Sequence, residues 1–239
     1  MNKKAKFVFL LINICFFAVL AGAQTGKTRL DQGIALYGEG KWREAVLELR
    51  RAQAEAVNNS QRSEALYWIA LSEIGAGEYE AALRDLDEIL KIDISGNRSG
   101  EVPYQKGRCL YYLGQYDKAI VLLKAYADTH TDPSKIAASF YWIGECLYSL
   151  GQLELAQEVF YRIVDEFPQS AKYEAANYRI ALINQKKVEA ELLAILKWSH
   201  EESLKTVEAY QRRERSYDQA IIAYQKRIAD MLKAQEEKK

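Results

Sequence analysis

The chain has 239 residues, of which 49% are hydrophobic and 28% charged, so it can bury a core and is not a disordered tail. Its 33 basic and 33 acidic residues balance, which argues against nucleic acid as a partner. All three prolines lie between Pro103 and Pro168, and no glycine follows Gly151. Because long stretches lack helix breakers, the composition predicts an all-α protein.

The first 23 residues are typical of a secretory signal. Three lysines within the first six residues precede an apolar run from Phe7 to Leu20, and Ala21-Gly22-Ala23 is a small-residue cleavage site. The run is shorter than the roughly 20 residues that span a membrane. We therefore predict that residues 1–23 are a signal peptide and that the protein is exported to the periplasm or cell envelope. An uncleaved N-terminal anchor is the alternative.

The sequence that follows repeats every 37 residues. The period is set by four glycines, each with a small residue seven positions before it and an alanine five positions after it. The glycines are Gly40, Gly77, Gly114 and Gly151, the small residues are Gly33, Ala70, Gly107 and Gly144, and the alanines are Ala45, Ala82, Ala119 and Ala156. We interpret each unit as two helices that a glycine turn joins and that pack closely at the small residues. No unit can bury its apolar face alone, so the units should stack.

The fourth unit carries a family resemblance through Phe140, Gly144, Gly151, Ala156 and Pro168. This pattern resembles the tetratricopeptide repeat (TPR), which implies a TPR superhelix, a right-handed α-solenoid. The 37-residue spacing is similar to exported bacterial TPR proteins of the cell envelope, of the Tol–Pal-associated or outer-membrane assembly type. The chain differs from both, because it lacks a lipid-anchor cysteine at the cleavage point and its extra helix is C-terminal.

The resemblance divides the chain into three parts. After the signal, residues 24–183 form the TPR array, with about four full repeats and the first helix of a fifth. Residues 184–239 form a C-terminal helical extension, because twelve positions at alternating steps of three and four include nine apolar residues. These positions are Leu193, Leu196, His200, Ser203, Val207, Tyr210, Glu214, Tyr217, Ile221, Tyr224, Ile228 and Met231. This seam predicts long helices that partly fold back on the array or pair as a coiled coil, either with a second partner or by self-association through 193–231. A degenerate capping repeat over about 198–232, with its turn at 213–216, is the competing interpretation.

Tyrosines form two columns at the repeat period. One column is Tyr67, Tyr104, Tyr141 and Tyr178, and the other contains Tyr37, Tyr111 and Tyr148. The family resemblance implies that this face of the first helices lines a concave groove, where the tyrosines would contact an extended peptide or a partner helix. The alternative is that they only pack between neighbouring helices. Arg108, Glu145 and Arg179 on the same helices differ in sign, which argues against a dedicated clamp for a carboxylate.

Catalytic chemistry has little support in the sequence. The two histidines lack partners at metal-ligand spacing, and Cys109 and Cys146 occupy equivalent positions that predict two small buried side chains. We predict no cofactor, no metal and no enzymatic activity. The predicted function is an exported scaffold for a protein or peptide partner, with peripheral association with the envelope. The alternative is a structural subunit of an envelope-biogenesis, outer-membrane assembly, division or periplasmic motor-associated complex.

Overall fold

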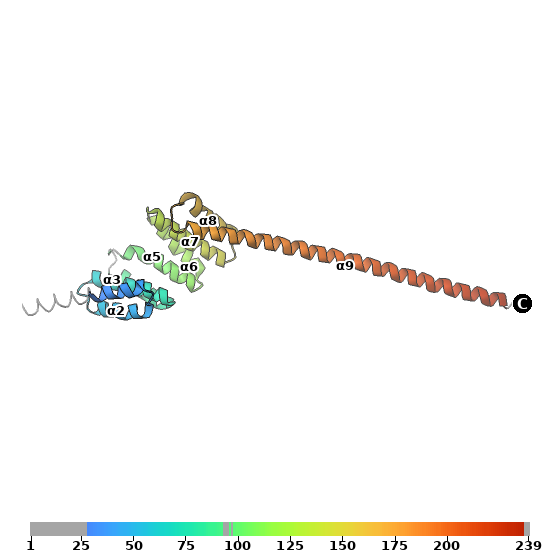
Figure 1. Cartoon of the computed structure of the whole chain (residues 1–239), viewed down its shortest axis with the longest axis horizontal. Coiled ribbons are helices and arrows are strands. Elements are labelled where there is room, and N and C mark those ends of the chain that lie inside the picture. Colours follow the sequence, from blue (N-terminus) through green and yellow to red (C-terminus); the bar gives the residue numbers. More distant parts are fainter. Residues whose placement is uncertain (1–27, 93–95, 97, 237–239) are drawn as a thin grey trace, which may run out of the picture. The chain divides into compact units, whose positions relative to one another are not determined.

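The computed structural model describes residues 28–92, 96 and 98–236 (Figure 1). Every regular element in these ranges is helical, as the composition predicts. The chain divides after Ile180 into two compact units, a repeat array and the remainder of the last helix. The predicted signal peptide, residues 1–23, lies outside the described residues.

The array consists of helical pairs that follow one another along the chain (Figure 1). A short 3₁₀ turn, η1 (Ser99–Glu101), leads into the third pair, and each helix from α2 to α8 packs against the next. The pairs are a helix over 28–38 with α2 (Trp42–Ala54), α3 (Asn59–Ala76) with α4 (Tyr79–Ile92), α5 (Val102–Tyr112) with α6 (Tyr116–Thr129), and α7 (Pro133–Ser149) with α8 (Leu153–Glu166). This arrangement confirms the predicted all-α repeat solenoid.

The turn within each pair is made by the predicted glycine. Gly77 ends α3 in the left-handed conformation at φ +81°, and the next amide, of Glu78, donates to the Glu73 carbonyl at 2.8 Å. That bond satisfies a carbonyl that the end of the helix would otherwise leave unpaired, and glycine adopts the conformation without a steric penalty. The same hydrogen bond recurs at the other three turns, after Gly40, Gly114 and Gly151.

Helix pairs approach closely where the repeat places its small residues. A β-carbon added to Gly144 would lie 2.6 Å from the ring of Phe160, and one added to Gly107 would lie 2.6 Å from Leu123. Phe160 and Leu123 are fully buried and stand one repeat apart on the second helices. The absent side chain therefore makes the space into which the large residue of the second helix packs.

The last helix, α9 (Tyr173–Glu236), starts as the first helix of a fifth repeat and continues without interruption for 64 residues (Figure 1). The turn at 213–216 that a capping repeat requires is absent, so that alternative is wrong. The physical reason is local: position 188 holds valine where the repeat needs its turn glycine, and nothing after it breaks the helix. No helix among the described residues is long and apolar enough to cross a membrane.

A buried carboxylate joins the first two repeats. Glu73 is 3% exposed, and its Oε1 accepts a hydrogen bond of 3.0 Å from Arg50, which also forms an ion pair with Asp85. Its second oxygen, Oε2, is buried without a hydrogen-bond partner. Burial and the neighbouring Asp85 raise the pKa of Glu73 to about 8, even though Arg50 acts in the opposite direction.

Glu73→Gln is expected to make the protein more stable at pH 8 and to change its stability little at pH 4. Since the folded-state pKa lies above the unfolded value of 4.5, the wild-type carboxyl costs stability as the pH rises from about 4.5 towards 8. The amide removes that cost, which is on the order of 1–3 kcal/mol for a buried unpaired polar group. Urea unfolding at several pH values measures the difference, and a pH slope identical in the two proteins would contradict it.

Candidate functional site

Ion pairs between neighbouring repeats follow the 37-residue period, and they determine which charges the array leaves without a partner. Glu64 pairs with Arg98, and one period later Glu101 pairs with Lys135. The third equivalent pair would join residue 138 to Lys172, but residue 138 is alanine. Lys172 therefore keeps the position of the paired cations without their carboxylate.

The ring contacts of Lys172 repeat those of Arg98. Arg98 lies over the rings of Tyr67 and Trp68, and Lys172 lies over the equivalent rings, with its Nζ 4.6 Å from the Tyr141 centroid and 5.9 Å from the Trp142 centroid. Burial and then the charge of Arg108 lower the pKa of Lys172. Lys172 therefore lies close to a second cation, Arg108, and is partly shielded from water.

Arg108 also has no carboxylate partner, because the charged residues at its position and at the facing position differ between repeats. One period later its position holds Glu145, whose carboxylate is 3% exposed and forms a bidentate ion pair with Arg179. The residue that stands for Arg179 in the preceding repeat is Trp142, and the Arg108 guanidinium lies 5.4 Å from its ring centroid. Arg108 Nη1 donates to Gln105 at 2.9 Å, while its Nε is buried without a hydrogen-bond partner.

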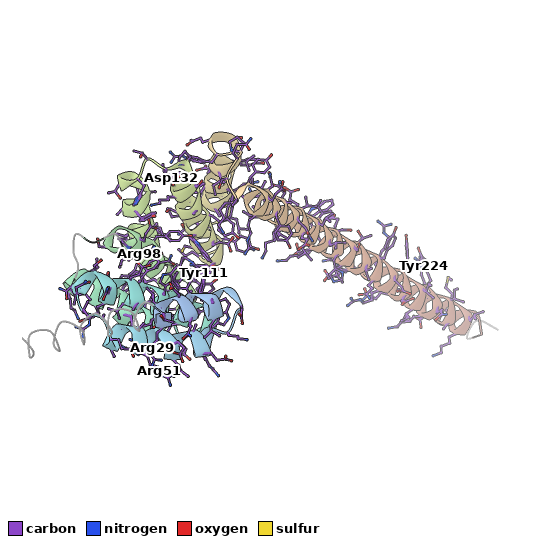
Figure 2. All side chains as sticks on the ribbon, turned by 60° about the vertical axis from the view of Figure 1, so that its left-hand side comes forward. Arg29, Arg51, Arg98, Tyr111, Asp132 and Tyr224 are labelled. Atoms are coloured by element: carbon purple, nitrogen blue, oxygen red, sulfur yellow. The ribbon has the colours of Figure 1, made fainter. Side chains whose placement is uncertain are left out.

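The two cations share one aromatic residue. Trp142 is 9% exposed and its indole N–H donates to the Tyr104 hydroxyl at 3.1 Å. The ring of Tyr111 contacts it at 5.1 Å between centroids, and Figure 2 labels this tyrosine within the array. Among the described residues, no carboxylate lies within 4 Å of the charged nitrogens of either Arg108 or Lys172. We call Tyr104, Arg108, Tyr111, Tyr141, Trp142 and Lys172 the Trp142 site.

The predicted groove residues fall into several environments. Those in the Trp142 site are Tyr104, Arg108, Tyr111 and Tyr141, and Glu145 lies next to them in its ion pair. Tyr148 lies beneath the guanidinium of Arg179, at 5.0 Å from its ring centroid, and Tyr178 is 63% exposed. Tyr37 and Tyr67 belong to the first repeats, where they pack edge-on against Trp68. Binding of a partner by these residues stays a prediction.

The tyrosine columns also connect repeats. The Tyr67 hydroxyl accepts from the Gln105 amide at 3.2 Å, and the Tyr104 hydroxyl accepts from Trp142, each 38 residues further along. These two hydroxyls therefore have protein partners, which the sequence did not reveal. Sequence reasoning also missed Trp142 and Lys172. The signal available was the alanine at 138, where two preceding repeats carry glutamate.

The two cysteines of the array are in a state that disfavours nucleophilic catalysis. Cys109 and Cys146 are fully buried and unpaired, as predicted, and burial raises the pKa of each thiol to about 12. A thiol with such a pKa is a poor nucleophile near neutral pH. Within the described ranges, His, Cys, Asp and Glu side chains form no group of three or more that could hold a metal ion.

The family comparison agrees with the geometry. Residues 104–171 match the sequence model of the tetratricopeptide repeat, and residues 38–126 match that of subunit 3 of the anaphase-promoting complex, or cyclosome. The helical pairs are therefore tetratricopeptide repeats, and the chain is a TPR-repeat protein. No curated protein sequence matches the chain significantly.

Three solved structures of similar fold are the following. MamA residues 41 to the end from Desulfovibrio magneticus RS-1 shares 23% identity, with a TM-score of 0.55 over 71% of this chain and 89% of that one. A Rap protein complexed with competence and sporulation factor shares 17%, with a TM-score of 0.58 over 70% and 50%. A putative kinesin light chain repeat protein from Podosopora anserina shares 17%, with a TM-score of 0.55 over 72% and 92%. At these identities the likeness concerns the fold alone.

Proposed function

We propose that the protein is an exported interaction scaffold of the periplasm or cell envelope that binds an acidic segment of a partner protein at the Trp142 site. The observation that carries the proposal is the pair of cations, Arg108 and Lys172, neither of which has a carboxylate partner among the described residues. TPR scaffolds are typically non-enzymatic and bind protein or peptide partners, which supports a binding function. An envelope location rests on the sequence of residues 1–23.

The chemistry of the site favours a carboxylate beside an apolar group. The guanidinium of Arg108 and the ammonium of Lys172 provide charge-assisted donors for a carboxylate. The half-buried rings of Tyr104, Tyr111 and Tyr141 add a rigid apolar area at low entropic cost. A partner segment that combines Asp or Glu with an aliphatic or aromatic residue would use both features.

Arg108→Ala/Lys172→Ala is expected to weaken binding of an acidic peptide about tenfold to a hundredfold. The reason is that the partner's carboxylate would then lose its charged donors in a partly desolvated place. A fluorescein-labelled peptide of alternating Glu and Leu, titrated by fluorescence anisotropy at about 0.15 M salt, provides the measurement. A peptide of alternating Lys and Leu tests whether the acidic charge is required.

The matched control is Lys118→Ala/Lys124→Ala, which removes two exposed lysines of α6 and so changes the net charge equally. It should alter the dissociation constant less than twofold, because neither lysine belongs to the Trp142 site and exposed charges outside the contact act only through screened fields. If both double variants bind as the wild type does, the Trp142 site is not where the peptide binds. Equal weakening in both double variants would show that the loss comes from the change in net charge and not from the Trp142 site.

Export is tested separately from binding. Expression with the natural N-terminus in a bacterium that has a periplasm should yield a chain that begins at Gln24, recovered in the periplasmic fraction. Intact-protein mass spectrometry identifies the first residue. A full-length chain in the membrane fraction would instead support the retained anchor, and a full-length chain in the cytoplasm would contradict export.

The second candidate function is that of a structural subunit in a larger envelope assembly. It is favoured by the apolar residues exposed along α9, which suit a lasting association, including association with further copies of the chain through 193–231. Recovery of the protein only within a large complex, without a free pool, would favour this function over reversible binding of a partner.

A further inference from the structure

The second unit of the chain exposes an apolar seam along its whole length. From residue 188 to residue 234 every side chain of α9 is exposed, and Figure 2 shows Tyr224 projecting from the helix surface. The nine apolar residues of the seam are 50–67% exposed. They recur at the steps of three and four that define the a and d positions of a coiled coil, with Leu193 at a and Leu196 at d. A helix of this composition buries its seam by pairing with another helix.

The exposed part of α9, residues 188–234, has halves of opposite charge. Residues 188–211 contain five acidic and two basic side chains, whereas residues 212–234 contain six basic and three acidic ones. At neutral pH the halves are therefore close to −3 and +3. Two copies aligned in parallel would place like-charged halves together, and two antiparallel copies would place each acidic half beside a basic half.

The seam itself has a register that suits antiparallel pairing. In an antiparallel pair, a positions of one helix face d positions of the other. The twelve seam positions all find partners among themselves only when the residue numbers of each facing pair add to 424. The facing pairs are then Leu193 with Met231, Leu196 with Ile228, His200 with Tyr224, Ser203 with Ile221, Val207 with Tyr217, and Tyr210 with Glu214.

This register also places two of the three polar seam residues favourably. Glu214 faces Tyr210 and His200 faces Tyr224, and each phenol hydroxyl can hydrogen-bond the polar group opposite it. A parallel pair in register would instead set Glu214 against Glu214 of the second copy, with two carboxylates in an apolar seam. The symmetry centre of the antiparallel register falls at residue 212, where the helix changes from acidic to basic.

We propose that the occupant of the α9 seam is a second copy of this chain, bound antiparallel over residues 193–231 with its centre at Arg212. The inference rests on the proposed self-association and specifies its partner, orientation and register. The assembled protein would then carry two Trp142 sites, one in each copy.

Cysteine cross-linking in the full chain tests the orientation. In a Cys15→Ser background, Leu193→Cys and Met231→Cys are prepared singly and together, and disulfides are formed with oxidised glutathione. The native Cys109 and Cys146 remain, because both are fully buried. The antiparallel register holds the two copies of position 193 about 57 Å apart, at 1.5 Å per helical residue. Neither single variant should cross-link, whereas the double variant should form a covalent dimer.

Each outcome separates this proposal from the function it rests on. Light scattering first gives the mass of the uncross-linked protein, and circular dichroism shows that the variants remain helical. A dimer in which only the double variant cross-links supports the proposal. A dimer in which Leu193→Cys alone cross-links is parallel and overturns the orientation while self-association stands. A monomer or trimer overturns the proposal, and neither result affects binding of an acidic peptide at the Trp142 site.

Discussion

Gly144→Ala is expected to lower the free energy of unfolding of the array by about 1–3 kcal/mol, because it overfills a closely packed core. The new methyl carbon would lie 2.6–3.0 Å from three atoms of the Phe160 ring. Gly144 is buried in the middle of α7 and Phe160 is fully buried in α8, so neither helix can move without disturbing the next repeat. Thermal or urea unfolding monitored by circular dichroism measures the loss.

A second substitution should rescue the first. In the second repeat the equivalent positions are alanine and leucine, Ala70 and Leu86, and both are fully buried. Gly144→Ala/Phe160→Leu recreates that natural combination, so its destabilisation should be smaller than the sum of the two single effects by about 1 kcal/mol or more. Simple additivity would show that the ring contact does not cause the loss.

The control for Gly144 is Gly38→Ala. A β-carbon added to Gly38 meets no atom within 4 Å, and the residue lies in the helix over 28–38 without a positive φ. Alanine should therefore stabilise the protein there, by up to about 1 kcal/mol, because it reduces the backbone freedom of the unfolded chain. A large loss at Gly38 would show that α-helical glycines in this array are sensitive for a reason other than packing.

Arg179→Ala is expected to destabilise the protein by about 3–5 kcal/mol at neutral pH, because it leaves the buried carboxylate of Glu145 without a counter-ion. Glu145 is 3% exposed and both its oxygens accept from Arg179, across 34 residues of sequence. Removal of an exposed salt bridge such as Arg162 with Glu166 should cost less than about 1 kcal/mol. Arg162→Ala is therefore the matched control.

A double variant separates charge from packing. Arg179→Met/Glu145→Met, which removes both charges and keeps similar volume, should cost far less than Arg179→Ala alone. A double variant as unstable as Arg179→Ala would instead assign the effect to lost side-chain packing.

Much of the fold follows from local rules that the sequence displays. Glycine alone takes the left-handed turn at Gly77 without strain, and a small residue alone fits opposite Phe160, so the repeat period predicts both the turns and the closely packed pairs. The TPR class follows from the same positions. The candidate site was visible only in part, because Tyr104, Arg108, Tyr111 and Tyr141 could be named from the sequence while Trp142 and Lys172 could not.

The sequence by itself determined the helical repeat, its turns and the seam of the last helix, because backbone conformation and apolar periodicity depend on residues near one another in the chain. It left open whether residues 184–239 form a cap or an extended helix. Only the tertiary structure decided that α9 continues without a turn. The tertiary structure also decided which charges remain unpaired, since ion pairing depends on side chains from neighbouring repeats that must lie within about 4 Å of each other. Arg108 and Lys172 stand out for that reason.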